Sequence, residues 1–258
     1  MNIDDTRQAF ESDGFAVAEN VLDRSRLQEL IENVDRYRTQ VAPTFSEGHD
    51  GAMYLDPARR DTLIRMVKMQ EHDAYFREMP MGAPWIGLAQ ALLGERVENI
   101  SVVYFNKPSR RVHANHPSPP HQDNFYLQLD PPNMMSFWIP LEPVDAENGC
   151  LRFVAGSHRK GIRRHVISSV YGFSQGLADY GPDDWMNERR VALMPGHAVA
   201  HHCMTIHRAD ANESDTRSRV ALVLIYQGKS ARVDEAWRAR HQENVRKQQA
   251  ALGRKSTA

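Results

Sequence analysis

Two separated segments decide the fold: PPHQDNFY at residues 119–126 and HHCMTIH at residues 201–207. The first segment holds His121 and Asp123 two positions apart, and alternate residues of a β-strand point to the same face of the sheet. One strand can therefore offer an imidazole and a carboxylate to a single ion. Two histidines and one carboxylate on one face of Fe(II) leave the remaining coordination positions open to other ligands. The sequence therefore predicts a mononuclear metal site that takes its second histidine from elsewhere.

His207 is the favoured third ligand, because it ends the second segment and turn-forming residues follow it. His201 has the same strand parity as His207 and remains an alternative ligand, whereas His202 has the opposite parity. An isolated His-x-Asp pair is common on protein surfaces, so the prediction depends on the two segments together. We expect His121, Asp123 and His207 to hold the metal.

Two arginines follow the second segment, Arg217 and Arg219. A cosubstrate such as 2-oxoglutarate chelates iron through its keto-acid end, and its far carboxylate requires a fixed cation. The planar guanidinium group suits this task, because it binds a carboxylate with two parallel hydrogen bonds. Arg219 is preferred because it opens the apolar run at residues 220–226, whereas Arg217 lies in a polar loop. Both arginines remain candidates at this point.

Composition excludes several classes of protein. The formal net charge is −1 over 258 residues, which favours no polyanionic partner, so we expect no nucleic acid. The only cysteines, Cys150 and Cys203, form no C-x-x-C motif, which argues for a reducing compartment. The first residues contain no apolar signal core, and no apolar run approaches the roughly 20 residues that cross a membrane. We expect a cytoplasmic protein with no membrane partner, and its oligomeric state is left open.

The order of predicted elements indicates a mainly β fold with flanking helices. Short β-rich runs separated by turn signals fill residues 99–228 and follow a helical part, which is typical of a jelly roll with helices packed outside. We expect one domain over residues 1–258, with a helical part at 1–98, a jelly-roll core at 99–228 and a C-terminal helix at 232–252. Individual predictions include helices at residues 62–69 and 85–93, and strands at residues 125–129, 151–154 and 198–202.

The chain resembles the phytanoyl-CoA dioxygenase family of Fe(II)/2-oxoglutarate oxygenases over residues 13–226. The resemblance is carried by the segments DGFAVAENVLD (13–23), FNKPS (105–109), PPHQDNFY (119–126), NGCLRFVAGSH (148–158), PGHAVAHH (195–202) and HRADANESDTRSRVAL (207–222). It implies a cupin-like double-stranded β-helix core that uses Fe(II), 2-oxoglutarate and O2. His121, Asp123 and His207 match the iron ligands. Arg219 matches the arginine that binds the far carboxylate, although one extra residue separates it from His207.

The same resemblance implies further cosubstrate-binding residues, namely Trp138, Val103, Lys68 and Gln122. Ordinary core positions for Trp138 and Val103, and a surface position for Lys68, are the competing interpretations. The implied reaction is hydroxylation of an unactivated C–H bond, with release of succinate and CO2. The carboxylate of Asp123 favours this outcome, because halogenating relatives lack it.

The substrate is expected to be a small polar metabolite, such as an amino-phosphonate, an amino-acid derivative or an aminoglycoside-like natural product. Candidate substrate residues are Tyr104, Asn106, His116, Asn124, Phe125 and His158, with His165, Tyr171 and Trp185 as further pocket candidates. Two alternatives remain: a non-redox metal enzyme on a cupin-like barrel, since several divalent metals compete for such ligands, and a ligand-binding protein of the same fold.

Overall fold

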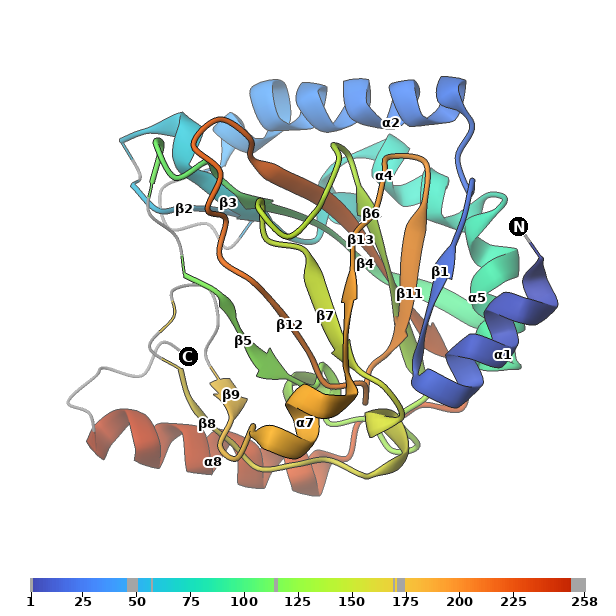
Figure 1. The fold of residues 1–258 in the computed structure, drawn as a ribbon, viewed down its shortest axis with the longest axis vertical. Coiled ribbons are helices and arrows are strands. Elements are labelled where there is room, and N and C mark those ends of the chain that lie inside the picture. Colours follow the sequence, from blue (N-terminus) through green and yellow to red (C-terminus); the bar gives the residue numbers. More distant parts are fainter. Residues whose placement is uncertain are drawn as a thin grey trace.

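The computed structural model describes residues 2–45, 51–56, 58–113, 116–168, 170 and 175–251. Seven antiparallel strands form the larger sheet, in the order β1-β11-β6-β13-β4-β3-β2 (Figure 1). Their bounds are β1 Phe15–Ala18, β2 Ala52–Tyr54, β3 Leu63–Met66, β4 Val97–Lys107, β6 Met134–Pro140, β11 Ala198–His202 and β13 Arg219–Gly228.

A smaller four-stranded sheet faces the larger one, in the order β10-β7-β12-β5. Its strands are β5 Ser118–His121, β7 Leu151–Val154, β10 Glu188–Val191 and β12 His207–Ala209. A separate hairpin pairs β8 (His165–Ile167) with β9 (Gln175–Leu177). Two facing antiparallel sheets with helices outside are the jelly-roll arrangement that the sequence predicts.

The helices gather mainly around the larger sheet. They are α1 Ile3–Asp13, α2 Arg24–Arg36, α3 Met69–His72, α4 Ala74–Glu78, α5 Trp85–Leu93, α6 Asn124–Leu127, α7 Pro182–Asn187 and α8 Glu235–Ala251. Shorter turns are η1 Tyr37–Val41, η2 Ala42–Thr44, η3 Arg60–Thr62, η4 Met79–Met81 and η5 Ser157–Arg159. None of the helices in this described part of the chain is long and apolar enough to cross a membrane.

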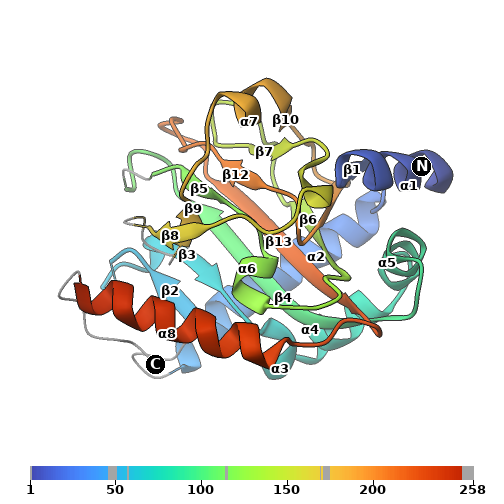
Figure 2. The same cartoon turned by 90° about the horizontal axis from the view of Figure 1, so that it is seen from below.

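Two apolar cores lie on the two faces of the larger sheet. One core packs the sheet against α2, α4 and α5, and the other fills the space between the two sheets (Figures 1 and 2). Strand β6 belongs to both cores, and every one of its residues is buried. A strand covered on both faces reads as a continuous apolar run, which explains the segment MMSFWIP. The site described below lies in the second core.

Local signals fix several element ends. Asp23 caps α2, because its side-chain carboxylate accepts a hydrogen bond from the backbone N–H of Arg26 at 2.9 Å. Helix α5 ends at Gly94, whose φ of 72° is the left-handed conformation that suits glycine. The predicted helix at residues 85–93 and the predicted strands at 151–154 and 198–202 match α5, β7 and β11.

Two predictions need correction. Residues 63–66 form strand β3, where a helix over 62–69 was expected, because β3 pairs with β4 and extends the larger sheet. The expected strand at 125–129 is instead helix α6, which ends at Gln128 in the left-handed region. Besides its helices, the N-terminal part contributes β1, β2 and β3 to the larger sheet. The predicted C-terminal helix at 232–252 corresponds to α8, and residue 252 lies outside the described residues.

Candidate active site

The predicted metal ligands meet at the end of the smaller sheet. His121 on β5 and His207 on β12 are directly opposite each other in the strand pairing, and their ring centroids are 4.2 Å apart. Asp123 follows β5, and its Oδ1 lies 3.6 Å from Nε2 of His121 and 3.7 Å from Nε2 of His207. Ligand atoms of the three residues lie within 4.8 Å of one another, which suits a single ion.

Hydrogen bonds orient both histidines toward this point. Nδ1 of His121 lies 2.8 Å from the carbonyl oxygen of Pro119, and Nδ1 of His207 lies 3.0 Å from that of Thr205. Each Nδ1–H therefore donates to a carbonyl, which leaves the lone pair of Nε2 available to a metal. Burial lowers the pKa of His207 to about 3 and lowers that of His121 as well. Both rings are thus held neutral, as metal binding requires.

The second oxygen of Asp123 has a different partner. Nε2 of His201, on the neighbouring β11, lies 3.3 Å from Oδ2 of Asp123. Burial alone raises the pKa of the Asp123 carboxyl group, but His207 and His201 outweigh this effect and the pKa falls below its usual value. The carboxylate is therefore ionised, with Oδ1 facing His121 and His207 while Oδ2 accepts from His201.

A pocket of about 340 Å³ opens between the two sheets in front of these ligands. Arg219, Trp138 and Val103 line it, as expected of the cosubstrate site. The guanidinium carbon of Arg219 lies 5.4 Å from the centroid of the Trp138 ring, and the side chain is buried. Burial lowers the pKa of Arg219 to about 10, which leaves it charged at neutral pH. Within the described residues, no carboxylate forms an ion pair with it.

Arg217 is engaged elsewhere. Its NH2 atom lies 2.9 Å from Asp145 and 2.6 Å from Glu147, both in the turn that follows β6. Arg217 does not line the pocket. Of the two arginines that the sequence leaves open, Arg219 therefore lies in the pocket with the predicted metal ligands, and Arg217 does not.

The sequence failed to identify Arg65, a second cation of the pocket. Arg65 on β3 pairs with Phe105 on β4, and its guanidinium carbon lies 5.5 Å from the Phe105 ring centroid. Its Nε atom is buried without a hydrogen-bond partner among the described residues. Burial lowers its pKa. The sequence signal for Arg65 is an arginine inside the apolar run LIRMV. The prediction of a helix over residues 62–69 gave this arginine no place in the sheet.

Lys68, expected to reach the cosubstrate, points elsewhere. Its side chain is 62% exposed, and its Nζ forms an ion pair with Glu71 at 3.4 Å. Gln122 lies between two metal ligands, yet its side chain faces the opposite way. The Gln122 amide donates to the carbonyl oxygens of Met204 and Gly161 at 2.8 and 3.0 Å. Gln122 is therefore buried, its hydrogen bonds hold neighbouring backbone segments together, and it does not line the pocket.

The predicted substrate residues do not line the metal pocket. Tyr104 and Asn106 alternate with the inward-facing Val103 and Phe105, and Tyr104 packs in the core on the other face of the sheet. Asn124 is buried and binds the backbone of Leu129 at 3.0 and 3.1 Å.

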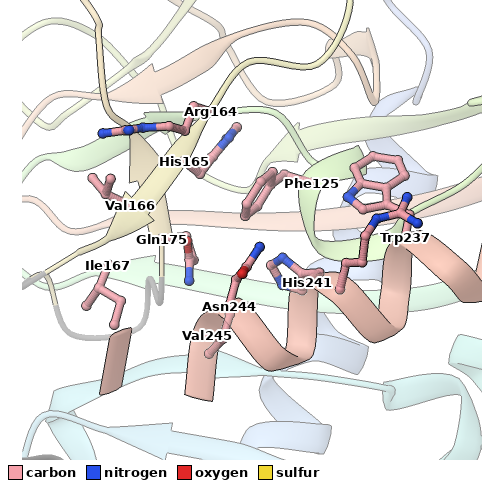
Figure 3. A pocket seen from close by; sticks show the side chains of 11 residues that line it. Phe125, Arg164, His165, Val166, Ile167, Gln175, Trp237, His241, Asn244 and Val245 are labelled. Carbon is pink, nitrogen blue, oxygen red and sulfur yellow. The ribbon is translucent and has the colours of Figure 1, made fainter. Parts of the chain in front are cut away.

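The other candidates also lie outside the lining of the metal pocket. His116 and Trp185 are exposed, and Nε2 of His158 contacts the carbonyl oxygen of Glu11 at 3.2 Å. Phe125 and His165 line a separate cleft beside α8 (Figure 3). Tyr171 lies outside the described residues. Residues that do line the metal pocket, but were not predicted, include Phe105, Tyr126, Leu127, Met134, Ser136 and Arg208.

Curated proteins named for phytanoyl-CoA dioxygenase are similar to this chain in sequence. Phytanoyl-CoA dioxygenase domain-containing protein 1 of Mus musculus is 30% identical over 152 residues, which cover 57% of this chain and 51% of that protein. Phytanoyl-CoA dioxygenase 1 of Oryza sativa subsp. japonica is 34% identical over 159 residues, covering 60% and 54%. These matches span about half the length of the curated relatives.

Solved structures share the fold at low sequence identity. The epimerase SnoN in complex with Fe3+, alpha ketoglutarate and nogalamycin RO has a TM-score of 0.70 at 22% identity, covering 89% of this chain and 84% of that one. EctD from S. alaskensis with 2-oxoglutarate and 5-hydroxyectoine has a TM-score of 0.70 at 16% identity, covering 88% and 77%. A family model for phytanoyl-CoA dioxygenase (PhyH) matches residues 10–221. Since that match covers most of the chain and includes His121, Asp123, His207 and Arg219, the chain belongs to the phytanoyl-CoA dioxygenase family.

Proposed function

We propose that this chain is a non-haem Fe(II)/2-oxoglutarate-dependent dioxygenase that hydroxylates a small polar metabolite. One observation carries the proposal. A cluster of two neutral histidines and one carboxylate shares a pocket with a buried arginine, Arg219, that has no acidic partner among the described residues. An unpaired buried charge is costly, so a site that keeps one is suited to an anionic ligand.

The donor set fits iron. Two imidazole nitrogens and one carboxylate oxygen on one side of an ion are the ligands of non-haem Fe(II) oxygenases, and the open side faces the pocket. His121, Asp123 and His207 would hold the metal. The carbonyl oxygens of Pro119 and Thr205 fix the orientation of the two rings.

The pocket also fits a dicarboxylate. Arg219 would bind the far carboxylate of 2-oxoglutarate, with its guanidinium group held against Trp138. Arg65 is a second unpaired cation on the same wall, three residues before Lys68, and it replaces Lys68 as the upstream cation in this proposal. Val103 lies on β4, between the two strands that carry these charges, and Trp138 lies on β6, on the other side of β13; both supply apolar surface to the pocket.

When bound, iron and 2-oxoglutarate would supply the activation of O2, with succinate and CO2 as co-products. The protein's own residues bind, orient and exclude water. Asp123 would bind the metal as a carboxylate, where halogenating relatives lack one, and this favours hydroxylation. The substrate would lie on the side of the metal lined by Tyr126, Ser136 and Leu127, where polar and apolar groups mix. This lining supports a small polar metabolite.

Two alternatives use the same fold. A non-redox metal enzyme could hold Zn(II) or Mn(II) with these ligands, and a binding protein could retain the pocket without turnover. A non-redox metal enzyme gives no reason for a buried Arg219 beside Trp138 that forms no ion pair within the described residues, whereas a dicarboxylate cosubstrate does. A binding protein would keep Arg219 but would release no succinate.

The test is an anaerobic titration of the purified protein with Fe(II) and 2-oxoglutarate, monitored by the weak visible charge-transfer band of the chelate. Wild-type protein should develop the band, Asp123→Ala should lose it, and the exposed matched control Asp183→Ala should keep it. Iron content is measured in each sample. An iron-loaded wild-type protein that develops no band contradicts the oxygenase proposal and favours the non-redox alternative.

A further inference from the structure

A second and larger cleft lies beside the metal pocket. It encloses about 700 Å³ and is lined by residues of α6, α8 and the β8–β9 hairpin. Figure 3 shows these side chains, and Figure 2 shows how α8, α6 and the hairpin are arranged. Backbone hydrogen bonds hold α8 in this place: the N–H of Asp130 donates to the carbonyl of Arg232 at 2.8 Å, and that of Asp234 donates to the carbonyl of Gln128 at 2.7 Å. The start of α8 is thereby fixed to the segment that follows α6.

Aromatic rings form the inner wall of this cleft. Phe125 of α6 stacks on His165 of β8, with centroids 3.9 Å apart and an interplanar angle of 16°. His241 of α8 meets the same phenyl ring edge-on, at 4.8 Å and 88°. Trp237 lies one helical turn earlier on α8 and lines the same cleft, as Figure 3 shows. Flat faces of this kind accept a planar group by stacking.

The charges of the cleft have one sign. Arg164 and Arg240 line it. Among the residues that the structure describes, no acidic side chain lines the cleft, and neither arginine forms an ion pair. His165 adds no charge, because its Nδ1 lies 2.9 Å from the carbonyl of Arg163 and its Nε2 accepts the backbone N–H of Gln122 at 3.1 Å. Two free guanidinium groups beside aromatic faces favour an anion, and guanidinium binds carboxylate, sulfonate and phosphate oxygens alike.

The cleft and the metal pocket share the short helix α6 as their common wall. Phe125 faces the cleft, whereas Tyr126 and Leu127 line the metal pocket. The Tyr126 hydroxyl donates to the carbonyl of Gln175, a cleft residue, at 2.7 Å. The backbone N–H that His165 accepts belongs to Gln122, which stands between His121 and Asp123. An occupant of the cleft is therefore separated from the metal ligands by one layer of side chains.

We propose that this cleft is a second ligand site, which binds a planar aromatic or heteroaromatic acid beside the metal pocket. Trp237 would stack on the ring of this ligand, and Arg240 and Arg164 would bind its anionic group. Because α6 separates the cleft from the metal pocket, the ligand is distinct from the substrate that reacts at the metal, and the proposal does not depend on the proposed function.

The probe is naphthalene-2-sulfonate, a planar aromatic anion, compared with the uncharged naphthalene-2-sulfonamide by isothermal titration calorimetry of the metal-free protein. Wild-type protein should bind the sulfonate more tightly than the sulfonamide. Trp237→Ala should weaken sulfonate binding roughly tenfold, because an aromatic stacking partner is lost. Arg240→Ala and Arg164→Ala should each weaken it about threefold, as expected for exposed charge pairs. Arg238→Ala is the matched control, since Arg238 lies on α8 but outside the cleft and pairs with Glu235 at 3.5 Å.

Arg219→Ala locates the bound probe. If the sulfonate occupies the cleft, Arg219→Ala leaves its affinity unchanged, whereas loss of binding in this variant assigns the probe to the metal pocket and overturns the proposal. Equal affinity for sulfonate and sulfonamide, no effect of Trp237→Ala and Arg240→Ala, or no binding to wild type at millimolar concentration each overturn it as well. The Fe(II)/2-oxoglutarate band is measured separately and requires neither Trp237 nor Arg240. Failure of the cleft and failure of the oxygenase proposal are therefore distinguishable.

Discussion

Nε2 of His201 lies 3.3 Å from Oδ2 of Asp123, while His121 and His207 approach Oδ1 of the same carboxylate. The side chain of His201 is buried, and its Nδ1 has no hydrogen-bond partner among the described residues. The described polar contact of the His201 ring is therefore the one with Asp123, a predicted metal ligand. We assign His201 as a positioning residue that holds the Asp123 carboxylate in the orientation the metal needs.

His201→Ala should weaken Fe(II) binding by roughly 10–100-fold, the usual effect of removing a partner of a metal ligand. His201→Gln, which keeps an N–H donor, should recover part of the affinity. Anaerobic Fe(II) titration measures both variants, with the exposed His116→Ala as control. Complete loss of iron, as expected for His121→Ala, would make His201 a ligand. Unchanged affinity would remove the positioning role.

Arg219 and Arg217 give a matched pair of variants for the cosubstrate site. Arg219→Ala should weaken 2-oxoglutarate binding by roughly 10–100-fold, because hydrogen bonds to charged groups contribute about 1.5–3 kcal/mol. Arg219→Lys should recover only part of it, since an ammonium group cannot form the two parallel bonds. Arg217→Ala should leave the affinity unchanged, because Arg217 pairs with Asp145 and Glu147. Titration of the visible band with 2-oxoglutarate measures all three, and a larger effect of Arg217→Ala contradicts the assignment.

The sequence predicted the metal site for a reason that is only half right. The alternation rule assumed that His121 and Asp123 share one strand, yet β5 ends at His121 and Asp123 has helical φ and ψ of −59° and −37°. The carboxylate reaches the site because the chain turns into α6 at this point. That turn depends on tertiary packing, which also explains why the β-rich letters FYLQL were misassigned as a strand.

Strand parity, in contrast, identifies which residues share a face but not which face is inside. Tyr104 and Asn106 were chosen as pocket residues, and the structure turns their neighbours Val103 and Phe105 inward instead. Both faces of β4 are covered, one by helices and one by the second sheet, so no pattern of polarity distinguished them. Elements with strong local signals were predicted well, such as α5, whose end is fixed by Gly94.

Buried neutral histidines predict a pH dependence of stability. Burial lowers the pKa of His202 to about 4, and its Nδ1 accepts the backbone N–H of Met204 at 3.1 Å. The unfolded chain, with a histidine pKa near 6.5, binds more protons than the folded chain between these values, so stability falls as the pH falls below about 6.5. His202 alone should cost up to about 2 kcal/mol between pH 7 and pH 5.

Urea unfolding of the metal-free protein at pH 7 and pH 5 measures this loss. His202→Asn keeps an acceptor near the position of Nδ1 but does not titrate in this range. The variant should lose less stability than wild type between the two pH values. A variant with the same pH dependence as wild type would show that His202 is not a source of the acid sensitivity.

Glu188 anchors a buried ion-pair network at the edge of the metal pocket. Its two carboxylate oxygens accept from Nε and NH2 of Arg208 at 2.6 and 2.8 Å, and from NH1 of Arg152 at 3.0 Å. The Tyr180 hydroxyl also donates to it. Glu188→Ala would leave Arg208 and Arg152 with Asp210 as their shared acidic partner. Because the two arginines keep Asp210 but lose their hydrogen bonds to Glu188, we expect a loss of about 1.5–3 kcal/mol in unfolding free energy.

Two variants separate the network from a general effect of removing a carboxylate. Glu188→Gln keeps an acceptor oxygen and should lose less stability than Glu188→Ala. Glu11→Ala breaks an exposed pair with Arg7 at 2.8 Å and should change the unfolding free energy by no more than about 1 kcal/mol. Urea denaturation at neutral pH compares the three. A Glu188→Ala variant as stable as Glu11→Ala would mean that Arg208 finds a new partner. Its side chain would then take a different place in the pocket lining.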